Sequence, residues 1–369
     1  MAAVNPLGRD SVSGLKDIVR LVEDDLGRVE EIFRSQVRSD VRLVGEIGRY
    51  IQEGGGKRVR PALLLLAGRL CGYRGERAVT LASTVEFIHT ASLLHDDIID
   101  EATTRRGRRS VNSRWGNDIT VLLGDFLYTK SMAMALSQDN LRILRLLSDV
   151  TLRLIEGEIL EIERNGNLRV TEADHLDTIR GGTAERVAAW TRVGALLGGG
   201  GEGRGEIRDS VRNGGLRVTE ADHLDTIRRK TADLFAACTR IGAILGDGGE
   251  EREQALGSYG LNLGLCFQMV DDLLDFTAEE KTLGKPVAND LREGKVTLPM
   301  IFLLRRGGKT AAEKVKAVLD DRSFSRVTRE ELVRMARECG ALDEARGMAE
   351  GYADLARRDL LAFDPSPYR

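Results

Sequence analysis

The chain has 369 residues, of which 42% are apolar and 31% charged, so it is a globular chain with enough apolar residues for a large core. Its formal net charge of −3 excludes a general nucleic-acid binder, and any anionic ligand must therefore be met by a local group of cations. The four cysteines, Cys71, Cys238, Cys266 and Cys339, lie far apart, which argues against a zinc site or a disulfide framework and fits a reducing cytosol. The first ten residues do not resemble a signal peptide, and no apolar run suggests a membrane span, so we expect a cytoplasmic protein.

Apolar residues recur at helical spacing along nearly the whole chain. The first helix is expected near Leu15–Val22, and a second near Leu43–Ile51. Residues 78–99 and 141–162 are expected to form long helices with broad apolar faces. The glycine cluster at 54–56 separates helices, and no convincing alternating strand pattern occurs. The predicted fold class is all-α.

One segment of the chain occurs twice. Arg164–Arg180 recurs almost unchanged as Arg212–Arg228, and the similarity then fades. Two copies are too few for a solenoid. We interpret the chain as a single domain, 1–369, with a tandem duplication in which about 168–215 are extra relative to 216–263.

The two copies differ in their suitability for a helix. Copy one has Gly181-Gly182 where copy two has Arg229-Lys230. Glycine inside a helix costs roughly 1 kcal/mol relative to alanine. We therefore predict that copy two occupies the native position and that copy one is looped out or lies on the surface. The opposite assignment is the alternative.

The first chemically informative cluster, Asp96, Asp97 and Asp100, follows His95 at the end of an apolar helical run. On a helix, Asp96 and Asp100 lie one turn apart, where like charges repel, and a bound cation would relieve that repulsion. Carboxylate oxygens in such a group suit Mg²⁺. A solvated acidic helix end is the alternative.

A second cluster repeats this DDxxD spacing after another apolar run, with Asp271, Asp272 and Asp275 preceded by Gln268. Either cluster alone is a weak signal in a chain this acidic. The presence of both favours a metal-binding function over two solvated helix ends.

Basic residues accompany the acidic clusters, and several of them adjoin glycines. Glycine allows close backbone approach to a phosphate, and lysine and arginine supply charge-assisted hydrogen bonds. Each group alone is compatible with ordinary surface cations, but together with the carboxylates they suit a diphosphate held through Mg²⁺. The groups are Lys57, Arg58 and Arg60 after Gly54–Gly56, Arg105-Arg106-Gly107, Lys230-Thr231 and Gly284-Lys285-Pro286.

This ordered set of motifs resembles the trans-isoprenyl diphosphate synthase (polyprenyl synthetase) family. The resemblance covers roughly residues 15–350 and implies an isoprenoid synthase fold, in which helices surround a deep central cavity, usually as a homodimer. The matching segments are 54–61, 95–100, 105–107, 230–231, 267–275 and 284–299.

The resemblance also implies roles for individual residues. Two or three Mg²⁺ ions on an allylic prenyl diphosphate would be bound by Asp96, Asp97, Asp100, Asp271, Asp272 and Asp275. The catalytic set would comprise Asp96, Asp97, Asp100, Lys230, Asp271 and Asp272. The allylic diphosphate would also contact Arg105, Lys230, Thr231, Gln268 and Lys285. Isopentenyl diphosphate would be held by Lys57, Arg58, Arg60, His89 and Arg106.

The implied reaction condenses isopentenyl diphosphate with farnesyl or geranylgeranyl diphosphate by ionisation, condensation and elimination. Short-chain members often have an aromatic residue four or five positions before the first aspartate, where this chain has Ser92 and Ala91. Small side chains there predict an open tunnel and a heptaprenyl to decaprenyl product. Such a product would pass to membrane enzymes, as in quinone side-chain synthesis.

Other functions are compatible with parts of the pattern. A terpene cyclase also uses a DDxxD cluster, but it commonly has a different second motif and no GGGKRxRP segment. A short-chain (farnesyl or geranylgeranyl) synthase is a second alternative. A non-catalytic partner subunit is a third, which both intact aspartate triads disfavour but the duplication keeps open. Spacing alone predicts that His95 is a hydrogen-bonded core residue, and Gln268 could be a structural hydrogen bonder.

Overall fold

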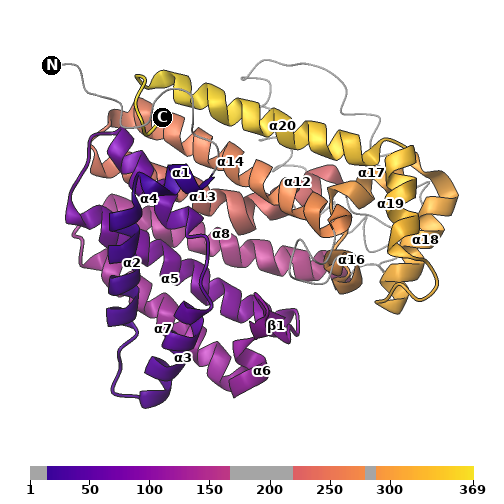
Figure 1. The fold of residues 1–369 in the computed structure, drawn as a ribbon, viewed down its shortest axis with the longest axis horizontal. Coiled ribbons are helices and arrows are strands. Elements are labelled where there is room, and N and C mark those ends of the chain that lie inside the picture. Colours follow the sequence, from indigo (N-terminus) through magenta and orange to yellow (C-terminus); the bar gives the residue numbers. More distant parts are fainter. Residues whose placement is uncertain (1–14, 167–218, 279–287) are drawn as a thin grey trace, which may run out of the picture. The chain divides into compact units, whose positions relative to one another are not determined.

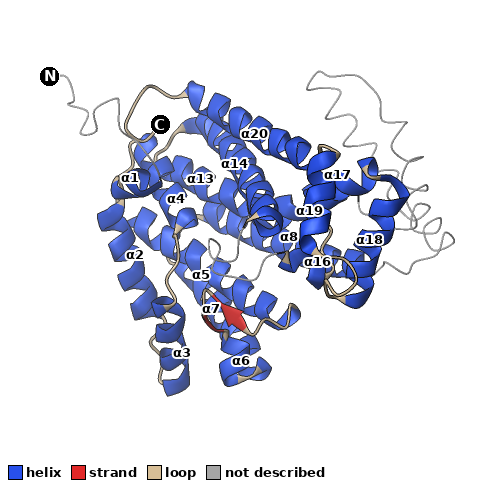
Figure 2. Ribbon diagram, turned by 45° about the vertical axis from the view of Figure 1, so that its right-hand side comes forward, coloured by secondary structure: helices blue, strands red, loops and turns tan. Residues whose placement is uncertain are grey.

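The computed structural model describes residues 15–166, 219–278 and 288–369, and these are almost entirely helical (Figures 1 and 2). Contacts divide the chain into two compact units, which are described separately. The first unit comprises 1–157, 224–287 and 346–369, and the second comprises 158–223 and 288–345. The prediction of an all-α fold is confirmed.

The first unit contains most of the long helices, labelled as in Figure 1. The predicted long helices at 78–99 and 141–162 are confirmed as α5 and α8. The elements are α1 (Leu15–Arg20), α2 (Glu23–Gln36), α3 (Arg42–Glu53), α4 (Val59–Leu70), α5 (Glu76–Ile99), α6 (Val111–Trp115), α7 (Asn117–Leu136), the π-helical turn η3 (Arg228–Ala232), α13 (Asp233–Leu245), α14 (Gly249–Thr277) and the 3-10 turn η4 (Leu360–Ala362).

The second unit is a smaller group of helices around a core that includes Leu298, Phe302, Val315 and Leu332. Among the described helices, three contain residues of both units: α8 (Leu141–Gly166), α12 (Glu220–Ile227) and α20 (Ala341–Asp359). The helices wholly within the second unit are α16 (Asn289–Glu293), α17 (Leu298–Arg306), α18 (Gly308–Asp321) and α19 (Arg329–Glu338).

A small hairpin supplies the only strands among the described residues (Figure 2). Strands β1 (Thr104–Arg105) and β2 (Arg108–Arg109) pair antiparallel across Arg106 and Gly107. These two residues have φ values of 52° and 74°, the signs that a type I′ turn requires at both central positions. No alternating pattern announces strands of two residues, which is why the sequence did not predict them.

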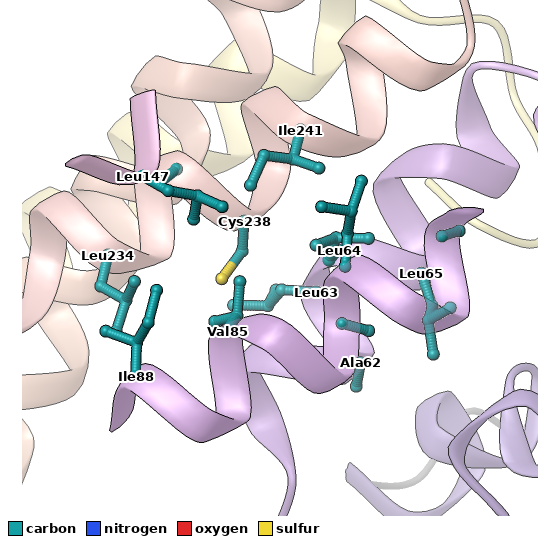
Figure 3. Packing of buried hydrophobic residues seen from close by; sticks show 14 of the residues in the cluster. Ala62, Leu63, Leu64, Leu65, Val85, Ile88, Leu147, Leu234, Cys238 and Ile241 are labelled. Atoms are coloured by element: carbon teal, nitrogen blue, oxygen red, sulfur yellow. The ribbon is translucent and has the colours of Figure 1, made fainter. Parts of the chain in front are cut away.

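Helix α13 is the centre of packing in the first unit, since it contacts both α4 and α14. Leu234, Cys238 and Ile241 are 0% exposed and lie against Leu64 of α4 and Val85 of α5 (Figure 3). Each fully buried Leu or Ile stabilises the fold by about 1.5–3 kcal/mol. Burial raises the pKa of the Cys238 thiol to about 12, so this cysteine is a packing residue rather than a nucleophile.

The approach of α14 to this central helix segment depends on a glycine. A Cβ atom on Gly264 would lie 2.5 Å from the Cα of Ala232, a distance that real Cβ atoms essentially never show. Any larger residue would push the two helices apart. The fully buried Phe235, in the next turn of the chain, would then lose its packing.

Helix α7 is the one described helix long and apolar enough to cross a membrane by length and composition, a property the sequence reading had not found. About 39% of the apolar window is buried inside the protein. Leu123 and Leu127 lie in a core cluster with residues of α5, and Asp125 lies 3.5 Å from His95. One face of α7 therefore packs in the core of the first unit, and other apolar side chains of the helix, such as Leu122, are exposed.

The described part of copy two forms α12, η3, α13 and the first half of α14. Thr219 and Asp222 close a capping box at the start of α12: the Asp222 N–H donates to Thr219 Oγ1, and the Thr219 N–H donates to Asp222 Oδ2, both at 3.1 Å. Further along, Arg229 pairs with Asp225 at 3.1 Å and with Glu156 at 2.8 Å. Copy one has Gly181 at the position of Arg229 and would lose both ion pairs.

The side chains that the two copies would place at the buried positions of α13 also differ. Residues 167–218, which include copy one, lie outside the described residues, so the comparison uses the sequence of copy one alone. Copy one has Arg186 at the position of Leu234 and Trp190 at the position of Cys238. Copy one in this position would bury an unpaired guanidinium and overfill the core. We propose that copy two occupies this position because its residues suit it.

Deletion of residues 168–215 is expected to leave a folded protein. Its Tm should change by no more than about 3 °C, which corresponds to a change of less than about 1 kcal/mol in the free energy of unfolding. Deletion of 216–263 is expected to prevent folding, because an unpaired buried charge costs about 3–5 kcal/mol. Circular dichroism thermal scans of the two variants test this. A stable second variant and an unfolded first one would assign the position to copy one.

Candidate active site

The main candidate site is a pocket in the first unit with a volume of about 610 Å³, including space open to solvent. The end of α3, the glycine loop, the C-terminal half of α5 and the β1–β2 hairpin line it. Two carboxylates, Glu86 and Asp97, face it together with five arginines. These arginines are Arg58, Arg105, Arg106, Arg108 and Arg109. The excess of positive charge makes the pocket suitable for a polyanion.

Arg58 enters the pocket from a strained backbone position. It has φ 48° and ψ 37°, the left-handed region, directly before the first residue of α4. Its Nη1 donates to Glu86 Oε1 at 2.5 Å, and its Nε donates to the carboxylate of Glu30. Burial alone would lower the pKa of Arg58, but the two carboxylates outweigh burial and raise the pKa.

Gly56 leaves room for two guanidinium groups, those of Arg58 and Arg106, beside the glycine loop at 54–56. A Cβ atom at Gly56 would lie 2.9 Å from Arg58 Nη1 and 3.0 Å from Arg106 Nη1. Desolvation lowers the pKa of Arg106, and the nearby charges of Arg58 and Arg105 lower it further. A bound anion would relieve this repulsion between guanidinium groups.

Arg60 and His89 form a second contact between the start of α4 and α5. Arg60 Nη1 lies 3.0 Å from His89 Nε2. A guanidinium only donates, so Nε2 is the acceptor and the imidazole proton is on Nδ1. Burial lowers the pKa of His89 well below 6.5, and Arg60, Arg105 and Arg106 add to the shift, so His89 is neutral at physiological pH.

The enclosed Nε atom of Arg60 has no hydrogen-bond partner among the described residues. Its guanidinium lies 5.1 Å from the ring centroid of Phe235, and burial lowers the pKa of Arg60. Phe235 in turn lies 5.4 Å from Phe267 of α14. Contacts therefore run from Arg60, at the start of α4, through Phe235 to Phe267, on the helix of the second acidic cluster.

The first acidic cluster lies at the C-terminal end of α5, where the helix dipole disfavours negative charge. Arg105 offsets this charge: its Nε lies 2.8 and 3.0 Å from the two oxygens of Asp97, and its Nη2 lies 2.7 Å from Oδ1. Asp97 is 2% exposed and lines the pocket, whereas Asp96 and Asp100 are half-buried. The hairpin therefore places the Arg105 guanidinium against the Asp97 carboxylate.

The second acidic cluster is oriented by a relay of hydrogen bonds. Thr231 Oγ1 donates to Gln268 Oε1 at 2.9 Å, and Gln268 Nε2 donates to Asp272 Oδ1 at 3.1 Å. Thr231 lies in η3, and π-helical turns frequently mark functional sites. Asp272 and Asp275 are buried and Asp271 is exposed. The structural role considered for Gln268 is therefore observed.

The donor atoms of both clusters fit a divalent cation. All of them are carboxylate oxygens, and Mg²⁺ needs only one or two protein carboxylates per ion when phosphate and water complete its coordination. Among the described residues, no three Asp, Glu, His or Cys side chains converge into a preformed metal site. The Asp97 carboxylate is held by Arg105, and the Asp272 carboxylate by Gln268.

The structure separates other predicted site residues from this pocket. Lys57 is exposed and is not part of the lining. Arg60 and His89, which contact each other, are not part of the lining either. Lys230 is half-buried on η3. Lys285 lies outside the described residues. His95 Nε2 lies 3.3 Å from the Val121 carbonyl, so the predicted hydrogen bond is observed, but 37% of the side chain is exposed and the prediction of a core residue is wrong.

The two positions predicted to control product length differ in their environment. Ala91 is buried in a cluster with Phe33 and Phe87, whereas Ser92 is only partly buried. Because Ser92 lies one turn before Asp96 on the same helix face, it is the better placed of the two to meet a chain attached at the aspartates.

Sequence reasoning missed Glu86, Tyr50 and Arg108, which line the pocket, and Glu30, which contacts the lining residue Arg58. Glu86 carried a usable signal, because a lone carboxylate in the apolar run of α5 must find a partner when buried. Tyr50 contacts the Arg108 guanidinium at 4.2 Å and donates from its hydroxyl to the Arg109 carbonyl at 2.7 Å. Nothing in the sequence marks Glu30.

An all-helical fold with two aspartate clusters and an arginine-lined pocket is an isoprenoid synthase fold. The Polyprenyl synthetase family profile matches residues 41–216 and 201–336, and the chain belongs to this family of prenyl-transferring enzymes. The two matched ranges overlap at 201–216, where copy one gives way to copy two.

Relatives match nearly the whole chain. The octaprenyl diphosphate synthase of Haemophilus influenzae is 33% identical, over 98% of this chain and 95% of that protein, and the octaprenyl diphosphate synthase of Escherichia coli is 34% identical, over 96% and 95%. A solved polyprenyl synthase from Caulobacter crescentus, complexed with calcium and isoprenyl diphosphate, superposes with a TM-score of 0.79 at 30% identity, covering 97% of this chain and 94% of that one. A decaprenyl diphosphate synthase from Rhodobacter capsulatus gives 0.78 at 32%, covering 96% and 95%.

The neutral state of His89 predicts a pH dependence of stability. Its folded pKa lies below the unfolded value near 6.5, so the unfolded chain binds more protons in the window between the two pKa values. The free energy of unfolding should fall as pH drops below about 6.5, by at most about 1.4 kcal/mol per pH unit. Urea unfolding at pH 7 and pH 5 measures this loss.

The His89→Gln variant, whose amide oxygen can still accept from Arg60, should show a smaller loss because glutamine does not titrate. Wild-type protein unfolded under the same conditions is the reference. Equal slopes in wild type and His89→Gln would contradict the neutral assignment.

Proposed function

We propose that the chain is a Mg²⁺-dependent synthase that condenses isopentenyl diphosphate with farnesyl or geranylgeranyl diphosphate into a long all-trans polyprenyl diphosphate. One observation carries the proposal: Asp97 of the first acidic cluster lines the same pocket as the arginines. Metal-binding carboxylates and diphosphate-binding cations therefore share one site, as the reaction between two diphosphates requires.

The arginine-lined pocket is the proposed site of isopentenyl diphosphate. Arg106, in the lining, and Arg60, outside it, are proposed to hold its diphosphate, assisted by Lys57 and Arg58, and the neutral His89 fixes the position of the Arg60 side chain. The lowered pKa values of Arg60 and Arg106 support this assignment, because both groups gain from a bound anion.

The allylic diphosphate is proposed to bind between the two acidic clusters. Asp96, Asp97 and Asp100 of α5 would hold Mg²⁺ ions together with Asp271, Asp272 and Asp275 of α14. When bound, the ions neutralise the diphosphate and make it a better leaving group. Direct contacts to this diphosphate come from Arg105, Lys230, Thr231, Gln268 and Lys285.

The proposed reaction begins when the allylic carbon–oxygen bond breaks and both electrons leave with the diphosphate. The double bond of isopentenyl diphosphate attacks the resulting carbocation and forms the new carbon–carbon bond. A proton then passes from the condensed chain to the departing diphosphate, which restores an alkene. The protein contributes position and charge rather than a covalent intermediate.

A product in the heptaprenyl to decaprenyl range is proposed. The small Ser92, one turn before Asp96, leaves room for a growing chain on that helix face. The names of the octaprenyl and decaprenyl relatives support the same range. A geranylgeranyl diphosphate synthase of Methanosarcina mazei at 31% identity makes a shorter product the alternative.

The enzyme is proposed to act in the cytoplasm as a homodimer and to pass its product to membrane enzymes, as in the synthesis of quinone side chains. Exposed apolar side chains on α7, Val121 and Leu122, and on α8, Leu152 and Ile155, support a second copy as partner. The widely spaced free cysteines support a reducing compartment.

Incubation with isopentenyl diphosphate, farnesyl diphosphate and Mg²⁺ is expected to give a product ladder ending between heptaprenyl and decaprenyl diphosphate by mass spectrometry. A chelator should abolish turnover. Asp271→Asn, at an exposed position, should lower kcat by about 10²–10³-fold because it weakens charge stabilisation of the leaving group.

Asp364→Asn, at an exposed position after η4, is the matched control and should retain wild-type activity. Absence of product from a folded wild-type protein that still binds isopentenyl diphosphate would favour the non-catalytic subunit.

Ser92→Phe is expected to shorten the product by several isoprene units, because an aromatic ring would fill the space before Asp96. Ser92→Ala keeps the side chain small and should leave the product distribution unchanged. Mass spectrometry of the released products compares the two variants. An unchanged product from Ser92→Phe would place the limit on chain length elsewhere.

A further inference from the structure

Glu30 of α2 lies outside every recognised motif but contacts both sides of the glycine loop at Gly54–Gly56. After the loop, the Arg58 Nε donates to Glu30 Oε1. Before the loop, Gln52 Nε2 donates to Glu30 Oε2 and to the Glu30 carbonyl, both at 2.9 Å. The two carboxylate oxygens of one residue therefore brace the loop at both of its ends.

Glu86 of α5 completes the enclosure of Arg58. It accepts from Arg58 Nη1 at 2.5 Å, and its side chain is 7% exposed, against 15% for Arg58 and 29% for Glu30. Arg58 therefore has two carboxylate partners inside the protein. Arg60, two residues later, instead meets the neutral His89, three residues after Glu86 on α5.

This difference in partners separates the roles of the two arginines. The positive charge of Arg58 is met by Glu30 and Glu86, and the pKa of Arg58 is raised. Burial lowers the pKa values of Arg60 and Arg106 despite the nearby charge of Glu86, and no hydrogen bond joins either arginine to a carboxylate in the part of the chain that the structure describes. The left-handed backbone of Arg58 is a conformation that surrounding contacts must hold. Its side-chain contacts supply that restraint.

We propose that Glu30 and Glu86 are positioning residues that act through Arg58 and hold the glycine loop in the shape that binds the diphosphate of isopentenyl diphosphate. The inference rests on the proposed function of the pocket. It assigns Arg58 a positioning role and leaves direct diphosphate contact to Arg60 and Arg106.

The sign of one mutational effect separates positioning from simple electrostatics. Glu30→Gln removes a negative charge near the pocket, so electrostatics alone would make an anion bind more tightly. Loss of the brace would instead make it bind more weakly. The two explanations predict opposite changes in the same dissociation constant.

The test is isothermal titration of the purified full-length protein with inorganic diphosphate and with isopentenyl diphosphate. Glu30→Gln should raise both Kd values about tenfold. It should also raise the KM for isopentenyl diphosphate similarly, while kcat and the KM for farnesyl diphosphate change less than about twofold. Glu31→Gln, an exposed neighbour on the same helix, is the matched control and should bind like wild type.

Two further variants show whether Glu30 acts through the loop. Glu30→Gln combined with Arg58→Met should bind no more weakly than Arg58→Met alone, since Glu30 then has no guanidinium to hold. Gln52→Met loosens the other side of the loop without changing charge and should weaken binding about threefold. If Glu30→Gln does not fold, the binding of Gln52→Met decides between the two explanations.

Tighter or unchanged binding by Glu30→Gln, together with unchanged binding by Gln52→Met, overturns the positioning inference while the proposed function stands. A wild-type protein that binds neither inorganic diphosphate nor isopentenyl diphosphate overturns the proposed function, and the inference with it.

Discussion

Repulsion among guanidinium groups is the constraint around which the pocket of the first unit is built. Arg58 and Arg106 approach each other over Gly56, and Arg105 lies close enough to depress the pKa of Arg106. Such a cluster persists only because the fold supplies partial compensation and a rigid frame. Asp97 neutralises Arg105, two glutamates neutralise Arg58, and a type I′ turn fixes the hairpin. The positive charge that remains uncompensated attracts a polyanion, and this preference exists before any ligand binds.

The packing around the candidate site depends on α13, which contacts both Arg60 of α4 and Phe267 of α14, the helix of the second acidic cluster. Its Phe235 supports the Arg60 guanidinium on one side and contacts Phe267 of α14 on the other. The preceding π-helical turn provides Thr231, which orients Gln268 and through it Asp272. Close packing, permitted by Gly264, makes these contacts a consequence of core formation rather than of surface loops. Substitutions in the core of α13 should therefore affect ligand binding as well as stability.

Residue patterns predicted the elements whose function depends on local spacing. Helical periodicity located α5 and α8, and the spacing of the aspartates located both acidic clusters at helix ends. Contacts between distant segments could not be predicted in this way. Glu30 lies in a charge-rich helix where nothing distinguishes it from its neighbours, and its partner Arg58 is set by how α2 packs near α4. The hairpin was missed because its strands are too short to carry a period.

The capping box at the start of α12 has a practical consequence for engineering. Thr219 and Asp222 satisfy each other's backbone N–H groups, so this helix terminus nucleates from its own residues. Chain length added before Thr219 costs only a slowly growing loop entropy. The position before Thr219 is therefore a suitable insertion site. A fluorescent protein or an affinity tag could be placed there, within the polypeptide rather than at one of its ends.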